Sequence, residues 1–327
     1  MRPVSPWIVA LALLAVPDHL AAQGATEPDT TAVTCPDGLS PAGLKVCNSA
    51  LDGIQIMHPV AALLMNGGNP RLGSAGVIGR FGHFALGVRT TTAMAVMPDL
   101  SWTGETDTVP ASWRVQLYAP KVDLAMGLFQ KEMPMGVIGV DVLLGLLLIP
   151  PNRTAALVPV PGNRTIGNAA FSLDWGIRAG IESPTLPTVS LSVMKRSSPT
   201  VRVGGTTNGR TTAWTFNASS INARLFVGKR MRWFEFAAGA GADLLSGNGE
   251  VAYRDPETDT VGAVLEPSLS GLRIVTALNL GVHLGPLHLA GEGGFQVGSN
   301  LGLATRYAQN NPNAGKFFGG FGVVLSY

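Results

Sequence analysis

The sequence predicts an all-β fold: a transmembrane antiparallel up-and-down β-barrel of about ten strands, with a short helical N-terminal segment. Three observations predict it: strands that alternate apolar and polar residues, connections that alternate between long and short, and an alternating aromatic pattern at the end of the chain. The 327 residues include 41 Gly, only 13% are charged, and the net charge is +2. This composition is too apolar for disorder, is too interrupted by glycine for helical membrane spans, and suggests no nucleic-acid partner.

The clearest strand is the stretch NAAFSLDWGIRAGIE, from Asn168 to Glu182. One set of alternate positions, from Ala169 to Ile181, is apolar, and the other set is small, polar or charged. Because successive strand side chains point to opposite faces, one face of this strand meets an apolar medium and the other a polar one. The pattern is longer than the ~9–11 residues that a tilted strand needs to cross a bilayer.

The same alternation recurs along the chain and predicts ten strands: Val77–Met97, Trp113–Gln130, Gly136–Leu148, Asn168–Glu182, Thr188–Val203, Thr211–Gly228, Met231–Leu245, Leu269–Leu284, Leu287–Gly298 and Lys316–Tyr327. Long or polar connections occur at Pro98–Ser112, Ile149–Thr165, Gly204–Arg210, Ser246–Ser268 and Ser299–Gly315. Short ones occur at Lys131–Met135, Ser183–Pro187, Lys229–Arg230 and Gly285–Pro286. Outer-membrane barrels have short periplasmic turns and long outer loops, so we expect both chain ends in the periplasm.

Two of the short connections predict a register. A hairpin turn at Lys229–Arg230 would place Leu225 opposite Phe234 and Arg224 opposite Glu235. A turn at Gly285–Pro286 would place Val282, His283 and Asn279 opposite Leu289, His288 and Glu292 respectively. In both hairpins apolar residues meet apolar residues and polar residues meet polar ones.

The N-terminal region has three expected parts. Arg2, an apolar run and the small residues near Ala22 are typical of a secretory signal peptide over residues 1–23, and a short membrane anchor is the weaker alternative. Residues 24–76 form a periplasmic or plug segment ahead of a barrel over 77–327. In this segment Cys35 and Cys47 predict a disulfide; a zinc site would need more ligands, for which His58 is the only candidate nearby.

A change of period in the same segment predicts a helix. From Asn48 to Met65 apolar residues recur at steps of three and four, with Asn48 or Ser49 able to cap the start. Pro59 would kink the helix or divide it into two pieces.

The last strand ends in an assembly pattern. Alternate positions carry apolar or aromatic residues up to the final one: Phe317, Phe321, Val323, Leu325 and Tyr327. With these residues the chain resembles bacterial outer-membrane β-barrels, whose terminal β-signal is recognised by the barrel-insertion machinery. That resemblance implies an outer membrane of the Gram-negative type, with membrane lipid, lipopolysaccharide and the insertion machinery as partners.

A narrower resemblance is to outer-membrane transporters of long-chain fatty acids. In that family a small N-terminal plug and an Asn-Pro segment precede the first strand, as the predicted helix and Asn69-Pro70 do here. This chain is shorter and has fewer strands than that family, so no binding residues follow from the resemblance.

The inward face supplies polar candidates for a functional lumen: Asp123, Asp141, Asp174, Arg178, Arg224, Glu235, Arg273, His283, His288 and Glu292. Asp123 and Asp141 lie on adjacent strands and could approach each other for acid–base work, or could pair with lumen arginines. The set of His283, His288 and Glu292 could bind a metal or could be polar lining of the lumen. The acidic loop from Arg254 to Thr260 could bind cations or could simply be solvated.

The lumen also carries many small residues: Ala125, Gly127, Gly139, Gly145, Gly176, Gly180, Gly239, Gly241, Ala277, Gly281 and Gly294. Because an eight-stranded barrel is just filled by its side chains, ten strands lined by Gly and Ala should leave a channel or room for another segment. We expect part of Asn48–Met65 to enter the lumen from the periplasmic side, the alternative being a helix packed outside.

These observations favour a porin-like or facilitated channel for a small solute. A structural or surface-interaction barrel that acts through its outer loops is the alternative, and an outer-membrane enzyme is a third reading. We expect no enzyme activity, cofactor or metal, because there is no GxSxG serine motif and the histidines lie at the periplasmic end rather than the outer rim.

Overall fold

The computed structural model describes residues 33–134, 136–150, 158–204, 211–298, 302–309 and 314–327. The expected signal peptide, residues 1–23, lies outside these residues. Within them, ten long strands form the barrel: β1 (Phe84–Pro98), β3 (Ala111–Met133), β4 (Gly136–Ile149), β7 (Ala169–Glu182), β8 (Thr188–Ser197), β11 (Ser219–Met231), β12 (Phe234–Tyr253), β13 (Ser268–Leu284), β14 (Leu287–Gly298) and β16 (Lys316–Ser326).

The ten strands close into one antiparallel barrel. Each pairs with the next along the chain, and the last, β16, pairs with β1 from Ala85 opposite Ser326 to Ala93 opposite Phe318. Closure leaves no barrel strand with an unpaired edge, which a bilayer requires because it offers no water to satisfy backbone groups. The predicted all-β antiparallel barrel is confirmed.

The outer surface of the barrel is apolar in the pattern that the sequence predicts. On β7, Leu173, Trp175 and Ile177 have exposed fractions of 57%, 62% and 57%, whereas Asp174 and Arg178 between and beside them are buried. The same alternation holds on β13, where Leu278 and Leu280 are exposed and Asn279 is buried. The apolar residues therefore face outward and the charged residues face the lumen.

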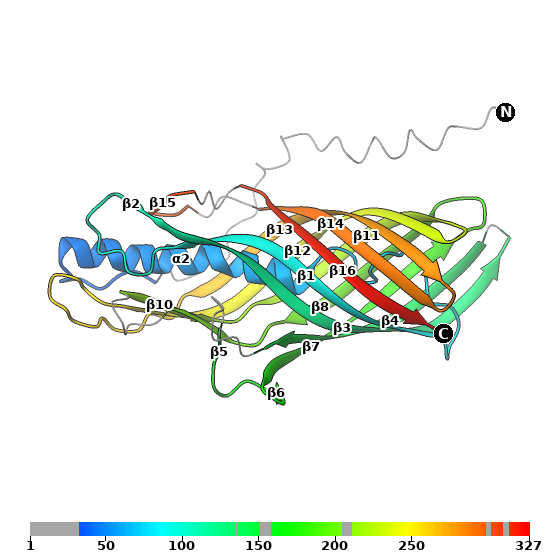
Figure 1. Cartoon of the computed structure of the whole chain (residues 1–327), viewed down its shortest axis with the longest axis horizontal. Coiled ribbons are helices and arrows are strands. Elements are labelled where there is room, and N and C mark those ends of the chain that lie inside the picture. Colours follow the sequence, from blue (N-terminus) through cyan, green and yellow to red (C-terminus); the bar gives the residue numbers. More distant parts are fainter. Residues whose placement is uncertain (1–32, 135, 151–157, 205–210, 299–301, 310–313) are drawn as a thin grey trace, which may run out of the picture. The chain divides into compact units, whose positions relative to one another are not determined.

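The barrel has two different ends. At one end Phe84 and Tyr327 exchange backbone hydrogen bonds of 2.9 Å, and the turns at Gly285–Pro286 and Arg232–Trp233 lie beside them. We call this the turn end and the opposite one the loop end. Figure 1 shows the C-terminus at the turn end and the longer strands β3 and β12 extending toward the loop end.

Six short strands complete the sheet structure: β2 (Thr108–Val109), β5 (Val158–Pro159), β6 (Thr165–Ile166), β9 (Val201–Gly204), β10 (Thr212–Phe216) and β15 (Arg306–Tyr307). At the loop end the outer part of β12 pairs with β10, which pairs with β9 and then β5. Strands β2 and β15 form a separate parallel pair. The loop end thus has its own layer of structure beyond the barrel wall.

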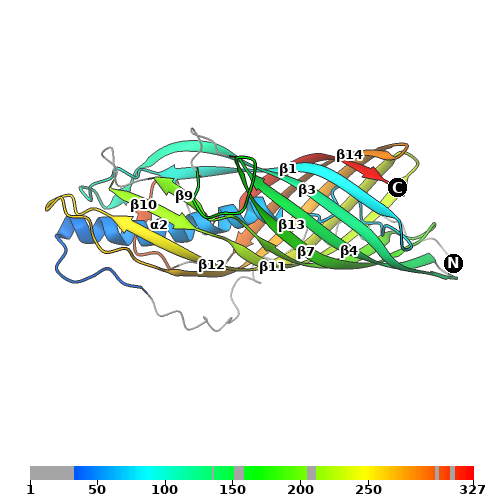
Figure 2. The same ribbon diagram turned by 90° about the horizontal axis from the view of Figure 1, so that it is seen from below.

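One helix, α2 (Pro41–Asn66), lies inside the ring of strands (Figures 1 and 2). It is longer than the predicted Asn48–Met65, because the cap is Ser40, whose side chain accepts a hydrogen bond from Gly43 N at 2.9 Å, and proline follows at the first helical position. It also runs through Pro59 as one helix. Nearly continuous burial offsets the ~3 kcal/mol that an interior proline costs.

Four predicted strands differ from the structure, one of them because Met231–Leu245 is instead β12, Phe234–Tyr253, which includes the start of the predicted connection Ser246–Ser268. The other three differ in where they begin or are divided. The first begins at Phe84 rather than Val77, because the chain as far as Gly79 stays in the lumen, where the backbone of Ile78 is bonded to Asp141. The predicted strand Thr188–Val203 is divided into β8 and β9, and Thr211–Gly228 into β10 and β11. The second division explains the change of phase near Ser219, since β10 leaves the barrel wall to pair with the outer part of β12.

The two predicted hairpins have different outcomes. The turn at Gly285–Pro286 has the predicted pairing, with His283 opposite His288. The turn predicted at Lys229–Arg230 is wrong. The structure continues β11 to Met231 and turns at Arg232–Trp233, which places Leu225 opposite Ala240 instead of Phe234. The longer strand gains ladder hydrogen bonds, and Lys229 Nζ donates to the carbonyl oxygens of residues 184 and 186 in the neighbouring turn at 2.8 and 2.9 Å.

Candidate functional site: the occupied lumen

The barrel encloses α2 and the glycine-rich stretch after it, and we call the segment Pro41–Gly79 the plug. The C-terminal half of α2 packs against small inward residues of the wall. Val60, Leu63, Leu64 and Met65 belong to one buried cluster with Ala93, Ala95, Leu117, Ala119, Leu147, Phe226, Ala237, Val275, Ala277 and Phe318. The cluster joins α2 to apolar residues of β1, β3, β4, β11, β12, β13 and β16.

The N-terminal half of α2 is enclosed at the loop end by a second apolar cluster. Its helix residues include Val46, Ala50, Ile54 and Met57, and its partners are Met97, Trp102, Val109, Val201, Val203, Trp214, Phe216, Val251, Tyr253 and Leu269. Most of these partners come from the short strands and outer loops rather than from the membrane-spanning part of the wall. The helix is therefore the common core of the barrel and of the loop-end layer.

Three wall arginines bind backbone carbonyl oxygens in the last turn of α2 and just beyond it. Arg196 donates to Met65 O at 3.2 Å, Arg224 to Gly68 O at 3.3 Å and Arg89 to Asn69 O at 2.7 Å. The last carbonyl groups of a helix lack intrahelical partners and carry the negative end of the helix dipole. Arg196 supplies a hydrogen bond to this end, and all three arginines place positive charge beside it, while Arg224 and Arg89 bind the chain just after the helix.

Wall acids and an amide bind the backbone N–H groups of the plug beyond the helix. Glu292 accepts from Asn69 N at 3.0 Å and Gly68 N at 3.3 Å, and Glu235 accepts from Ala75 N at 3.1 Å. Asn279 accepts from Gly73 N at 3.0 Å, and Asp141 accepts from Ile78 N at 3.1 Å. The polar wall is thus complementary to a peptide backbone without regular structure.

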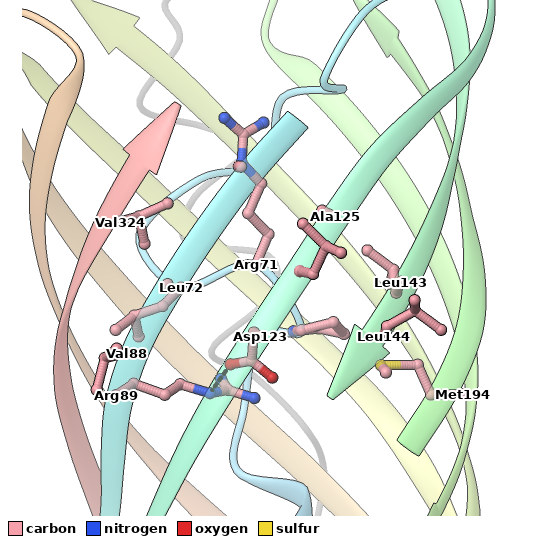
Figure 3. Close-up of a pocket in the computed structure, with 14 residues that line it drawn as sticks. Arg71, Leu72, Val88, Arg89, Asp123, Ala125, Leu143, Leu144, Met194 and Val324 are labelled. Carbon is pink, nitrogen blue, oxygen red and sulfur yellow. Dashed lines mark ion pairs between the residues drawn. The ribbon is translucent and has the colours of Figure 1, made fainter. Parts of the chain in front are cut away.

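Ion pairs within the wall hold these groups in place. Arg178 pairs with Asp141 at 2.5 Å, with side chains 1% and 0% exposed. Arg224 pairs with Asp243 at 2.7 Å, and Arg89 pairs with Asp123 at 2.6 Å (Figure 3). Buried charges of this kind are strongly destabilising when one partner is lost, so each pair constrains the side chain that contacts the plug.

The glycines of the wall make room for the plug. A Cβ atom at Gly127 would overlap the backbone of Gly79 and would lie 2.7 Å from Arg80 O. At Gly139 and Gly180 a Cβ atom would lie 2.8 and 2.9 Å from the side chain of Val77. Gly127, Gly139 and Gly180 therefore lie against the chain's own N-terminal segment, whereas other small inward residues, such as Gly176 and Gly239, lie against neighbouring wall strands.

Little free volume remains between plug and wall. A cavity of about 20 Å³, the room of a single water molecule, lies beside the Arg89–Asp123 pair (Figure 3). It is lined by Arg71 and Leu72 of the plug and by wall residues that include Ala125, Leu143 and Met194. A cavity of about 10 Å³ near Arg273 and Gln296 is smaller still.

The polar candidates from the sequence do not all come together. Asp123 and Asp141 lie opposite Gly145 and Gly127 respectively and each is bound to its own arginine, so they form no carboxylate pair. Asp174 accepts a hydrogen bond from Ser197 N at 3.1 Å. Arg273 lies buried beside the smaller cavity.

The histidines lie near the turn end. The rings of His283 and His288 stack with centroids 4.0 Å apart, and His283 Nε2 lies 2.9 Å from Glu235 Oε2. Glu292 points away from them to the plug backbone. Among the described residues no group of three His, Cys, Asp or Glu side chains is arranged to hold a metal ion.

The loop end clamps the start of α2. Ser40 Oγ and Ser40 N donate to the carboxylate of Asp255 at 2.7 and 3.0 Å, and these bonds lower the pKa of Asp255 to about 2. Thr305 N donates to Asp52 at 2.6 Å, although burial raises the pKa of Asp52. Ala42 N bonds Glu257 at 3.4 Å, so the acidic loop caps the helix. The predicted disulfide between Cys35 and Cys47 is present and closes a loop that contains Ser40 and the first turns of α2.

The sequence reasoning missed several lumen residues, notably Lys121, Arg196 and Asp243. All three are buried and inward-facing. Arg196 could have been found, because Lys195 before it falls on the outward, apolar phase and the next residue must point inward. No local signal in the sequence distinguishes an inward residue that binds the plug from one that faces a water-filled lumen.

Comparisons with known proteins give a fold-level result. No protein-family model and no curated protein matches the sequence. Solved structures with a similar arrangement include the outer membrane protease OmpT from Escherichia coli. The match has 12% sequence identity and a TM-score of 0.35, and it covers 75% of this chain and 95% of that chain. The transport unit of the autotransporter AIDA-I from the same organism has 10% identity, with 85% of this chain, 99% of that chain and a TM-score of 0.39.

A Pseudomonas aeruginosa FadL homologue is similar at 8% identity over 75% of this chain and 90% of that chain, with a TM-score of 0.29. Identities and TM-scores this low say nothing about what this chain binds or does. In the described residues no helix is long and apolar enough to cross a membrane. The described chain forms a closed antiparallel barrel of ten strands with an apolar outer face and a charged interior, which is the fold of a transmembrane β-barrel.

Proposed function

We propose that the protein is an outer-membrane channel for a small solute that its own N-terminal segment keeps closed. The observation that carries this proposal is the polar contact between plug and wall. Arginines and acids of the wall bind seven backbone groups of the plug directly: those of Met65, Gly68, Asn69, Ala75 and Ile78, with Gly68 and Asn69 each bound through both the N–H and the C=O. The passage of a solute would require this segment to move.

The chemistry of the contact supports a plug that can be displaced. An apolar filling of similar volume would stabilise a barrel at least as well, because burying charges costs desolvation energy. Polar contacts, in contrast, can be exchanged for contacts with water when the segment leaves, so the segment after Gly67 can detach without exposing a large apolar surface. The wall glycines opposite it would then widen the passage.

Single-channel recording of the purified full-length protein and of a variant lacking Cys35–Met65 tests the proposal. We expect small or rare conductance from the full-length protein and a several-fold larger conductance from the deletion variant. Two milder variants, Arg196→Ala and Arg224→Ala, remove contacts to the end of α2 and should raise the frequency of opening. Lys45→Ala is the matched control, because Lys45 forms an exposed ion pair with Asp107 away from the lumen.

The proposal of a plugged channel would be refuted if the deletion variant inserts with normal heat-modifiable migration but conducts no better than the full-length protein. A second function would then gain support, that of a surface-interaction barrel that acts through its outer loops. The loop-end layer around α2, with its own apolar cluster, is the observation that favours this alternative. Binding of the full-length protein to surface components of partner cells, lost on removal of a loop but unaffected by Arg224→Ala, would distinguish the two functions.

A further inference from the structure

The plug passes through the barrel once, from the loop end to the turn end. At the loop end Ser40 is bonded to Asp255, and the first turns of α2 lie against the outer loops, where Lys45 pairs with Asp107 at 2.9 Å. At the other side of the lumen the chain leaves the plug and enters β1 at Phe84, which is paired with Tyr327 at the turn end. The described residues before α2 therefore lie on the opposite side of the barrel from the start of β1.

The length of α2 supports this placement. Its 26 residues span about 39 Å at 1.5 Å per residue. The apolar band of an outer-membrane barrel is only about 25 Å tall. Even a helix whose lower part crossed the whole band would extend about 14 Å beyond it. The start of α2 must therefore lie outside the bilayer, at the loop end.

We infer that the barrel holds the segment Val33–Ser40 on the outer side of the membrane. The barrel would thus display a disulfide-closed N-terminal segment at the cell surface. This function goes beyond conduction, because it depends only on the direction of the plug and on the side that the loop end faces. It differs from the expectation that the segment enters from the periplasm.

Three features make this segment suitable for display. The Cys35–Cys47 disulfide ties it to the second turn of α2, and Cys47 is fully buried. Leu39 and Cys35 pack on the loop-end cluster, which fixes the base of the segment. Its tip is open: Pro36, Asp37 and Gly38 are exposed, and Gly38 has a positive φ of 86° in a turn with nothing within 4 Å of a Cβ position. A peptide inserted at this tip would project into solvent.

The native cysteines allow a test without changing the fold. Intact cells that express the full chain are treated with a reductant and then with a bulky polyethylene-glycol maleimide that cannot cross the outer membrane. We expect Cys35 to be labelled, as shown by a shift in gel mobility. The control chain carries Cys35→Ser and Cys47→Ser together with Gly285→Cys at the turn end, and it should be labelled only after the outer membrane is permeabilised.

A second readout does not depend on reduction. An epitope peptide inserted between Asp37 and Gly38 should bind antibody on intact cells, as should the same peptide inserted at the exposed Gly162 of an outer loop. Labelling of Cys35, or antibody binding at Gly38, that appears only after permeabilisation would overturn the inference. So would labelling of the Gly285 control on intact cells, since the loop end would then face the periplasm. Neither result depends on whether the barrel conducts.

Discussion

The Arg178–Asp141 pair offers the sharpest quantitative test of how the wall holds the plug. Both side chains are almost completely buried, and Asp141 also accepts the backbone N–H of Ile78. Removing one member of a buried ion pair leaves an uncompensated charge and costs about 3–5 kcal/mol. We therefore expect Asp141→Ala and Arg178→Ala each to lower the free energy of unfolding by about that amount.

The double variant separates the pair from its surroundings. Because it leaves no unpaired charge, we expect Asp141→Ala with Arg178→Ala to cost less than the sum of the single changes, by about 2–3 kcal/mol. The Ile78 N–H would still lose its acceptor, a cost of about 1–3 kcal/mol that should appear as protease sensitivity in the plug. The exposed Arg254–Asp259 pair is the control, and breaking it should cost about 0–1 kcal/mol.

The assay is urea-dependent unfolding of the protein in detergent micelles, followed by the heat-modifiable shift in gel mobility and by tryptophan fluorescence. Single variants that each cost less than the exposed control, or a double variant whose cost equals the sum of the single ones, would refute the reasoning. Either outcome would mean that water or another side chain replaces the missing partner.

Three further perturbations follow from the structure. Ser40→Ala removes the helix cap and should lower the free energy of unfolding by about 1 kcal/mol. Because the pKa of Asp255 is lowered, the stabilisation from its carboxylate should be complete above pH 4 and lost as the pH falls toward 2. Protease sensitivity near the start of α2 should therefore rise in that pH window, and Asp255→Asn should remove this pH dependence. Gly127→Val would overlap the plug backbone and should increase conductance or hinder folding, whereas Gly293→Ala, with nothing within 4 Å of its Cβ position, should change neither. Deleting Tyr327, which exchanges two hydrogen bonds with the first strand, should slow membrane insertion in pulse-labelled cells, and a normal rate would count against the terminal pattern as an assembly signal.

The sequence by itself determined the barrel, because in a membrane each strand must meet lipid on one face and the lumen on the other. Each strand therefore alternates apolar and polar residues with a period of two, and this pattern is visible in the sequence of each strand alone. The same periodicity explains one error: moving the partner of Leu225 from Phe234 to Ala240 is an even shift. Even shifts keep apolar residues opposite apolar residues, so alternation could not distinguish the two registers.

The sequence also predicted the inward position of the charged residues and the presence of a helix before the barrel. It did not predict what those residues contact. Whether Glu292 faces water, a metal or a peptide N–H is decided by what fills the lumen, and its partners Gly68 and Asn69 are more than two hundred positions away in the chain. Periodicity carries no information about contacts at that separation.

Only the tertiary structure decided the direction and extent of the plug. The start of α2 depends on Ser40 meeting Asp255, which is 215 positions away, and its path through Pro59 depends on apolar residues from many strands. Local propensity would end or divide the helix at that proline. Packing on all sides outweighs that propensity, and this energy exists only after the barrel has closed around the helix.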